Sequence, residues 1–164
     1  MPNDKHSDII SALRVLLASI TTGSEYWFTP SVVAEADGAF MNDLQNNAFE
    51  HVILISSGDE FVSEEVGEII EHTWEVFIAA SRKWQTLSDP MKRQRESRVA
   101  KLTIQNRMLH DIEKVIMSDV QLGGLVDNAI WPRAEVNRNF SMPEGRATLV
   151  IRLEIQFSLT RDTL

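Results

Sequence analysis

Histidine and carboxylate side chains are the groups in this sequence that could bind a metal ion or move protons. There is no cysteine, which excludes disulfides, zinc–thiolate sites and cysteine nucleophiles. No two histidines have the helical spacing of a zinc protease. The nearest approach to a ligand cluster is His110, Asp111 and Glu113, which can share one face if this segment is a helix. The four histidines are His6, His51, His72 and His110.

A metal-dependent hydrolase that uses His110, Asp111 and Glu113 is therefore one hypothesis. Loosely spaced ligands on one helix make a weak metal site, however, and the sequence has no P-loop, G-x-S-x-G or G-x-G-x-x-G motif. Gly123 and Gly124 follow a predicted helix, so we interpret them as its end and not as a phosphate-binding loop. The hypothesis we favour is that the protein is not an enzyme and has no catalytic residue, no metal and no cofactor.

Two short segments carry opposite charge. Acidic residues gather between 59 and 68, which we interpret as a solvated acidic loop, with a cation-binding loop as the alternative. Basic residues gather at the end of a polar stretch over 84–101, although the chain as a whole carries a net charge of −8. This separation suits self-association, in which the basic segment of one copy docks on the acidic patch of the next. A solvated helix end is the alternative for the basic run, and nucleic-acid contact is a third. The candidate subunit-interface residues are Arg93, Arg95, Arg98, Lys101, Glu60, Glu64 and Glu65.

The hydrophobic pattern predicts the elements that carry these residues. The stretch 146–159 alternates apolar and polar residues, which predicts a long strand with one buried face. Residues 7–21 and about 90–118 have the spacing of amphipathic helices, and Ser7 or Asp8 can cap the first. Further strands are predicted over 25–36, 51–57, 68–81 and 125–140, with Gly58 and Asp59 ending the second of these. Residues 37–50 and 141–145 are predicted to be a loop and a turn.

This order of elements predicts an α+β fold in a single domain over residues 1–164. The expected architecture is an antiparallel-rich β-sheet with two main α-helices packed on one face, from which the basic segment 84–101 projects. A chain of 164 residues, 43% of them hydrophobic, can bury a genuine core. No run of about 18 apolar residues occurs, so no membrane span is expected. The acidic net charge argues against a duplex DNA binder, but it suits a surface past which DNA must move without sticking.

Three stretches of the sequence resemble tail-terminator and minor-tail proteins of tailed bacteriophages. They are the helix IISALRVLLASITTG followed by YWFTPSVV, the segment HDIEKVIMSDVQLGGLVDNA, and the closing strand ATLVIRLEIQF. The resemblance covers most of the chain in order, although the polar segment 84–101 has no counterpart in it.

The resemblance implies a structural virion protein at the junction of head and tail, assembled in the host cytoplasm. Such a protein closes into a homo-oligomeric ring, commonly a hexamer, that caps the tail tube, ends its polymerisation and offers a docking surface to the neck. Its expected partners are further copies of itself, the tail tube protein, the neck or head-completion protein, and the sheath if the tail is contractile. Genomic DNA would pass through the lumen without specific binding. A tail-completion or neck adaptor protein is the alternative, and the hydrolase is a distant one.

Overall fold

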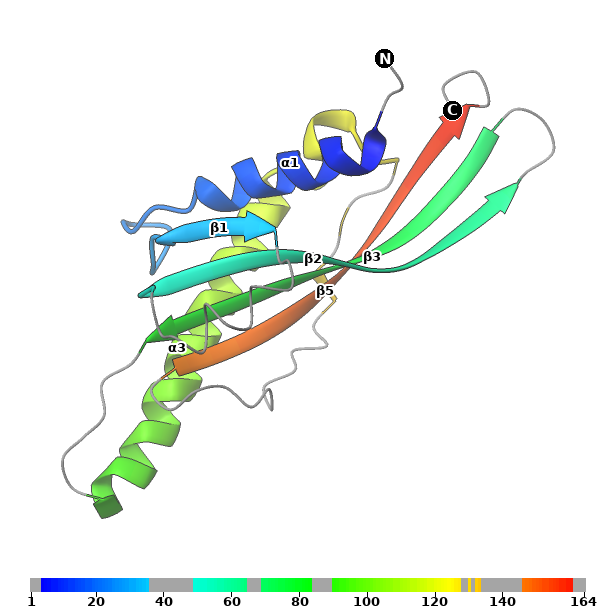
Figure 1. Cartoon of the computed structure of the whole chain (residues 1–164). Coiled ribbons are helices and arrows are strands. Elements are labelled where there is room, and N and C mark those ends of the chain that lie inside the picture. The colour runs from blue at the N-terminus through cyan, green and yellow to red at the C-terminus, as the bar shows by residue number, and fades with distance from the viewer. Residues whose placement is uncertain are drawn as a thin grey trace.

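A long, twisted sheet organises the chain, and strands far apart in sequence form its centre (Figure 1). The computed structural model describes residues 4–35, 49–64, 69–83, 90–127, 130, 132–133 and 146–160, with only the backbone at 64, 90–97, 132 and 133. The strand order is β1-β2-β3-β5-β4. β1 pairs with β2 in parallel, and all other neighbours are antiparallel. The strands are β1 (Val32–Glu35), β2 (His51–Glu64), β3 (Ile69–Lys83), β4 (Pro132–Arg133) and β5 (Arg146–Thr160).

Two helices cover one face of this sheet, which confirms the predicted fold class. α1 (Lys5–Ala18) and α3 (Pro90–Ser118) contact each other and the sheet, and η1 (Leu122–Gly124) follows α3. The alternation predicted for the closing strand holds, because every second residue of β5 from Leu149 to Phe157 is buried. The core residues shared by the helices and β5 are Ile9, Leu13, Leu17, Met108, Ile112, Val115, Ile116, Leu149, Ile151, Leu153, Ile155 and Phe157.

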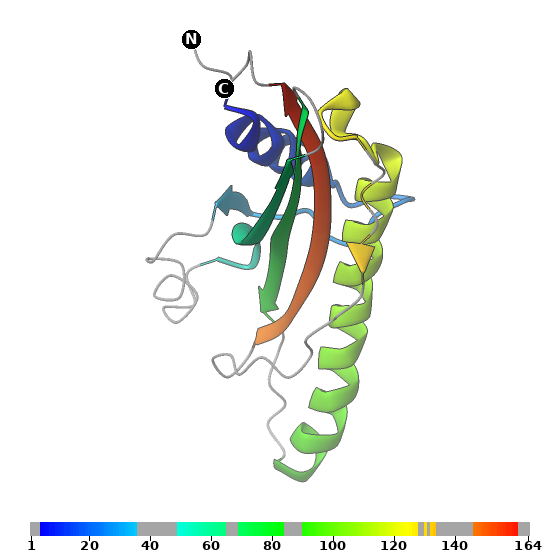
Figure 2. The same cartoon turned by 90° about the vertical axis from the view of Figure 1, so that its right-hand side faces the viewer.

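Both the strands and α3 extend beyond this core, in opposite directions. The far ends of β2, β3 and β5 run past the start of α1, and we call the part of β2 and β3 over residues 59–64 and 69–74 the arm (Figure 1). Figure 2 shows α3 beside β5, with its first turns continuing past the other end of the strands. Among the described side chains of α3, which start at Arg98, the first buried ones are Gln105 and Met108. The basic stretch over 90–101 is therefore the start of α3, whereas residues 84–89 lie outside the described part.

β2 is twice as long as the sequence suggested, because a β-bulge replaces the predicted break at Gly58 and Asp59. The register shifts by one residue between Ser57 and Glu60, and pairing with β3 then continues to Glu64. A Cβ atom at Gly58 would lie 2.5 Å from the ring of Phe77, so only glycine fits beneath this ring. The acidic residues from Asp59 to Glu64 accordingly belong to a strand, and the prediction of a loop was wrong for them.

The predicted strand over 25–36 is also wrong except for β1. The backbone N–H groups of Trp27 and Phe28 donate to the carboxylate of Asp111 on α3, at 2.9 Å each, and so have no strand as partner. By contrast, the predicted helix end is confirmed, since Gly123 and Gly124 have φ angles of 66° and 92° after α3. α1 begins earlier than predicted, because Asp4 caps it by accepting from Ser7 N. Of the predicted loop 37–50, residues 37–48 lie outside the described residues, as does the predicted turn 141–145.

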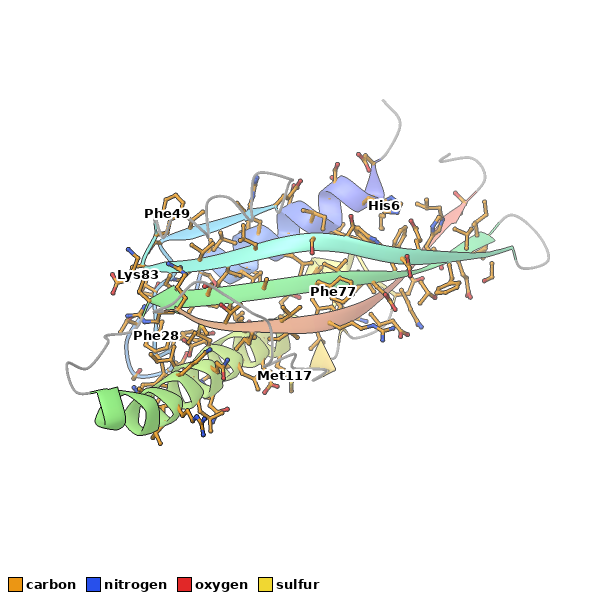
Figure 3. The ribbon with its side chains drawn as sticks, turned by 60° about the horizontal axis from the view of Figure 1, so that its bottom comes forward. His6, Phe28, Phe49, Phe77, Lys83 and Met117 are labelled. Carbon is orange, nitrogen blue, oxygen red and sulfur yellow. The ribbon has the colours of Figure 1, made fainter. Side chains whose placement is uncertain are left out.

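A buried polar cluster closes the end of the sheet opposite the arm. Arg146 is buried, and its guanidinium donates to Ser81 Oγ at 2.7 Å, to Ser81 O at 3.2 Å and to Phe49 O at 2.7 Å. Burial lowers the pKa of Arg146. Phe28, Phe49 and Lys83 lie at this end of the sheet (Figure 3), and the guanidinium of Arg82 lies 4.0 Å from the centre of the Phe28 ring. The cluster joins the start of β5 to the chain before β2 and to β3.

His51 at this end of the sheet makes the stability of the fold sensitive to acid. Burial first, and then the positive charges of Arg82 and Arg146, lower its pKa from 6.5 to about 4. As the pH falls, His51 therefore becomes protonated near pH 6.5 in the unfolded chain but only near pH 4 in the folded chain. We expect the free energy of unfolding to fall by up to about 3 kcal/mol between these pH values and then to level off.

Urea unfolding of the protein and of His51→Gln, followed between pH 4 and 7 at one protein concentration, measures this effect. The difference between the two free energies of unfolding should change with pH over that window. In His110→Gln, which replaces a half-exposed histidine, the slope should match that of the unaltered protein. An equal slope in His51→Gln would contradict the assignment.

Candidate functional site

Five of the nine large apolar side chains that are exposed in the described part of the chain lie at its two projecting ends, and the others are Val15, Trp27, Phe49 and Met117. On the arm, Phe61, Val62 and Ile69 are 69%, 56% and 51% exposed. Phe61 and Val62 are consecutive in a strand and point to opposite faces, so each face of the arm carries an exposed apolar side chain, whereas Ile70 and Trp74 of the arm are buried. At the start of α3, Val99 and Leu102 are 67% and 45% exposed. Apolar side chains exposed in such groups are typical of surfaces that bind another protein.

Charge at the two ends is opposite in sign, as the sequence predicted. The arm carries Asp59, Glu64 and Glu71, of which Asp59 and Glu71 have exposed side chains. α3 carries Arg98, which is exposed, and Lys101, which is half-buried, on the turns that extend past the sheet. Arg93 and Arg95 lie in the same helix, but their side chains and that of Glu64 are outside the description, as is Glu65 altogether. The candidate interface residues that lie within the described part thus separate into two groups at opposite ends of the subunit.

Glu60 does not belong to the free acidic patch, because two histidines bind its carboxylate. His6 Nε2 lies 2.8 Å and 3.0 Å from its two oxygens, and His72 Nδ1 lies 2.6 Å from Oε1. His6 is in the first turn of α1, Glu60 follows the bulge in β2, and His72 is on β3. Burial raises the pKa of Glu60, but hydrogen bonds from His6 and His72 lower it by more, so the carboxylate is held in its charged form.

Aromatic rings hold the two imidazoles of this cluster in place. The ring of His72 stacks on Phe157, with centroids 4.7 Å apart and planes 7° apart. The ring of His6 meets Trp74 and Phe157 edge-on, at 4.9 Å and 5.1 Å. Figure 3 shows His6 where α1 begins, beside the strands that run on into the arm. The side chain of His6 is 38% exposed and that of His72 is 11% exposed, so the cluster lies at the surface with apolar walls.

The sequence analysis missed this cluster, because its members are 12 to 66 residues apart and no motif connects them. The bulge decides its geometry. Without the extra residue, the register that pairs Ser57 with Val76 would place Glu60 opposite Thr73, which points away from the helices. With the bulge, Glu60 pairs with Trp74 on the helix-covered face, next to His72. The alternating pattern of a strand does not reveal where such an extra residue falls.

The sequence-predicted ligand group does not come together. Asp111 is buried, and its two carboxylate oxygens accept hydrogen bonds from Trp27 N and Phe28 N at 2.9 Å each. His110 Nδ1 makes a longer contact of 3.4 Å to Asp111 Oδ1. Within the described part of the chain, the group of three potential ligands that converges is His6, Glu60 and His72. A shallow depression of about 250 Å³ lies beside His110 and Lys114, against residues 23–27. The carboxylate of Asp111 thus fastens this segment to α3, which gives no support to the hydrolase hypothesis.

Replacing Asp111 by alanine tests this structural role. The change leaves two backbone N–H groups without their acceptor, and we expect a loss of about 2–3 kcal/mol in the free energy of unfolding. Glu113→Ala, on the same helix but half-buried, should cost less than about 0.5 kcal/mol. Chemical denaturation of both variants measures the difference, and equal stability of the two would show that Asp111 does not hold the segment.

Comparison of the chain with protein-family models and with curated protein sequences finds no match. Among the helices described, none is long and apolar enough to cross a membrane.

Proposed function

We propose that the protein is a structural subunit whose copies bind one another through two different surfaces and close into a ring, as the copies of a bacteriophage tail terminator do. The observation that carries the proposal is the pair of exposed apolar groups at opposite ends of the subunit, on the arm and at the start of α3 (Figure 1). A contact between two different surfaces of identical subunits forms a ring when its rotation closes. Each subunit then offers its arm to one neighbour and its first α3 turns to the other.

The chemistry of the two surfaces favours a second copy over an unrelated partner. Exposed apolar residues on the arm are accompanied by Asp59 and Glu71, and those on α3 by Arg98, so each surface complements the other in charge. The edge of β2 beyond residue 57 is not covered by β1, whose register ends at Ile55. Unpaired strand edges of this kind readily pair with another chain.

In the proposed role, the ring caps the tail tube, ends its polymerisation and presents a surface to the neck, while DNA passes through its lumen. A tail-completion or neck adaptor protein, the alternative role, would form the same kind of ring. The position of the ring in the particle distinguishes this role from that of a tail terminator. The proposal includes a ring of six copies and no catalytic activity. The strongly negative net charge of −8 suits a lumen that must not retain DNA.

The mass of the purified, tag-free protein tests self-assembly. Native mass spectrometry should show one closed stoichiometry at micromolar concentration, with six copies proposed. Because Arg98, Asp59 and Glu71 are exposed, the ring should need a higher protein concentration to persist as sodium chloride rises from roughly 0.05 to 0.5 M, the range over which exposed charges become screened. A monomer at all salt concentrations would contradict the proposal, and a ring insensitive to salt would reject the contribution of the charges.

A further inference from the structure

The cluster of His6, Glu60 and His72 has the composition of a metal-binding site. Two imidazole nitrogens and one carboxylate are a donor set that zinc uses with a fourth, open position. Magnesium and calcium prefer sites made of oxygen ligands, so this set selects a transition metal. The three ligand atoms lie within 4.8 Å of one another and come from α1, β2 and β3. We propose that His6 Nε2, His72 Nδ1 and the Glu60 carboxylate bind one divalent transition-metal ion, with zinc as the probe of choice.

The distances fit this proposal without a change of fold. Ligand atoms around a tetrahedral zinc ion, at about 2.0–2.1 Å from the metal, lie about 3.3 Å from one another. His72 Nδ1 and Glu60 Oε1 are 2.6 Å apart, and His6 Nε2 and Glu60 Oε1 are 2.8 Å apart. Each histidine nitrogen needs to move away from Glu60 Oε1 by less than about 1 Å, which small side-chain rotations allow.

The surroundings of the cluster favour binding over a merely solvated arrangement. Stacking on Phe157 fixes the ring of His72, and Trp74 and Phe157 confine the ring of His6. Asp4 holds the first turn of α1, which carries His6, through Ser7 N at 3.2 Å and Ser7 Oγ at 2.6 Å. Ligands held in this way lose little freedom when the metal enters.

The ion would tie the first turn of α1 to the base of the arm. Both histidines and Glu60 lie where the strands leave the cover of α1, so a bound metal fixes the angle at which the arm extends. Three protein ligands leave the fourth position to water. This inference stands apart from the ring, because it requires neither a second copy nor the tail.

Zinc binding is tested on the full-length chain without a histidine tag, by isothermal titration and native mass spectrometry. One zinc ion per chain is expected, together with a rise in melting temperature, because a ligand that binds only the folded state stabilises it. His6→Gln and Glu60→Gln should each weaken binding by about tenfold or more, since each removes one of three ligands. His110→Gln should bind as the unaltered protein does, and magnesium should not compete.

Cobalt provides a readout that a nonspecific association does not give. Bound Co²⁺ should show the intense visible absorption of a tetrahedral ion, and Glu60→Gln should lose it while its circular dichroism stays unchanged. Absence of saturable zinc binding in the unaltered protein would overturn the proposal and leave a hydrogen-bonded cluster alone. Equal zinc affinity in the unaltered protein, His6→Gln and Glu60→Gln would overturn it as well, because the metal would then lie elsewhere.

Discussion

Replacing Arg146 by alanine is expected to lower the free energy of unfolding by about 3–5 kcal/mol, because it opens a cavity and leaves buried acceptors unpaired. The guanidinium is buried and donates to Ser81 Oγ, Ser81 O and Phe49 O. The Oγ and carbonyl oxygen of Ser81 would lose a donor in the interior, where water does not replace it, and the partly buried Phe49 O would lose one as well. A loss of this size is a large part of the stability of a domain.

Arg152→Ala, in the same strand, is the matched control for this prediction. Arg152 lies on the same face of β5 as Arg146, where it forms an ion pair with Glu75, and its side chain is 35% exposed. Ion pairs of this exposure contribute about 0–1 kcal/mol, so the control should lose little stability. Urea unfolding at one protein concentration compares the two variants. Similar losses in both would show that burial of the Arg146 network does not govern stability.

If the proposed ring forms, replacing Phe61 by glutamate is expected to convert it to monomers, and Val99→Glu should do the same. Phe61 is on the arm and Val99 is at the start of α3, so either change places a charge in the proposed contact between neighbouring subunits. A buried, unpaired carboxylate costs several kcal/mol per interface, and a closed ring repeats this cost at each contact. Native mass spectrometry measures the loss of the ring directly.

Val15→Glu is the control that shows whether a charge at any exposed apolar position disrupts the ring. Val15 is on α1, away from both ends, and is 71% exposed, close to the 69% of Phe61 and the 67% of Val99. The ring should therefore persist in Val15→Glu, and all three variants should keep the circular dichroism and monomer stability of a folded chain. Loss of the ring in Val15→Glu, or its persistence in Phe61→Glu, would place the contact elsewhere.

Periodicity was sufficient to predict the long elements of the fold. The alternation over 146–159 and 68–81 and the helical spacing up to 118 correspond to β5, β3 and α3, because each buries one continuous face. Local chemistry was misleading where a distant partner decides the structure. Asp111 accepts hydrogen bonds from the backbone N–H groups of Trp27 and Phe28, which therefore do not pair in a strand. Gly58, which has no side chain, fits beneath the ring of Phe77, so β2 continues through a bulge where the sequence suggested a break.

The candidate sites differ in how far the sequence could predict them. Opposite charge at 59–64 and 90–101 was visible, and the fold places these segments at opposite ends of the subunit. The pairing of Glu60 with His6 and His72 was not visible, since it depends on the one-residue shift in β2 and on where α1 begins. The exposed apolar residues Phe61 and Val99 could not be identified either, because strand and helix patterns assign apolar residues to the core.

Mixing Phe61→Glu with Val99→Glu tests the central claim, that two different surfaces of the same chain bind each other. Each variant keeps one intact surface, the α3 start in Phe61→Glu and the arm in Val99→Glu. Native mass spectrometry of an equimolar mixture should show a two-chain species with one copy of each variant, whereas each variant alone stays monomeric. A mixture that contains only monomers, or dimers of a single variant, would contradict head-to-tail assembly through the arm and α3.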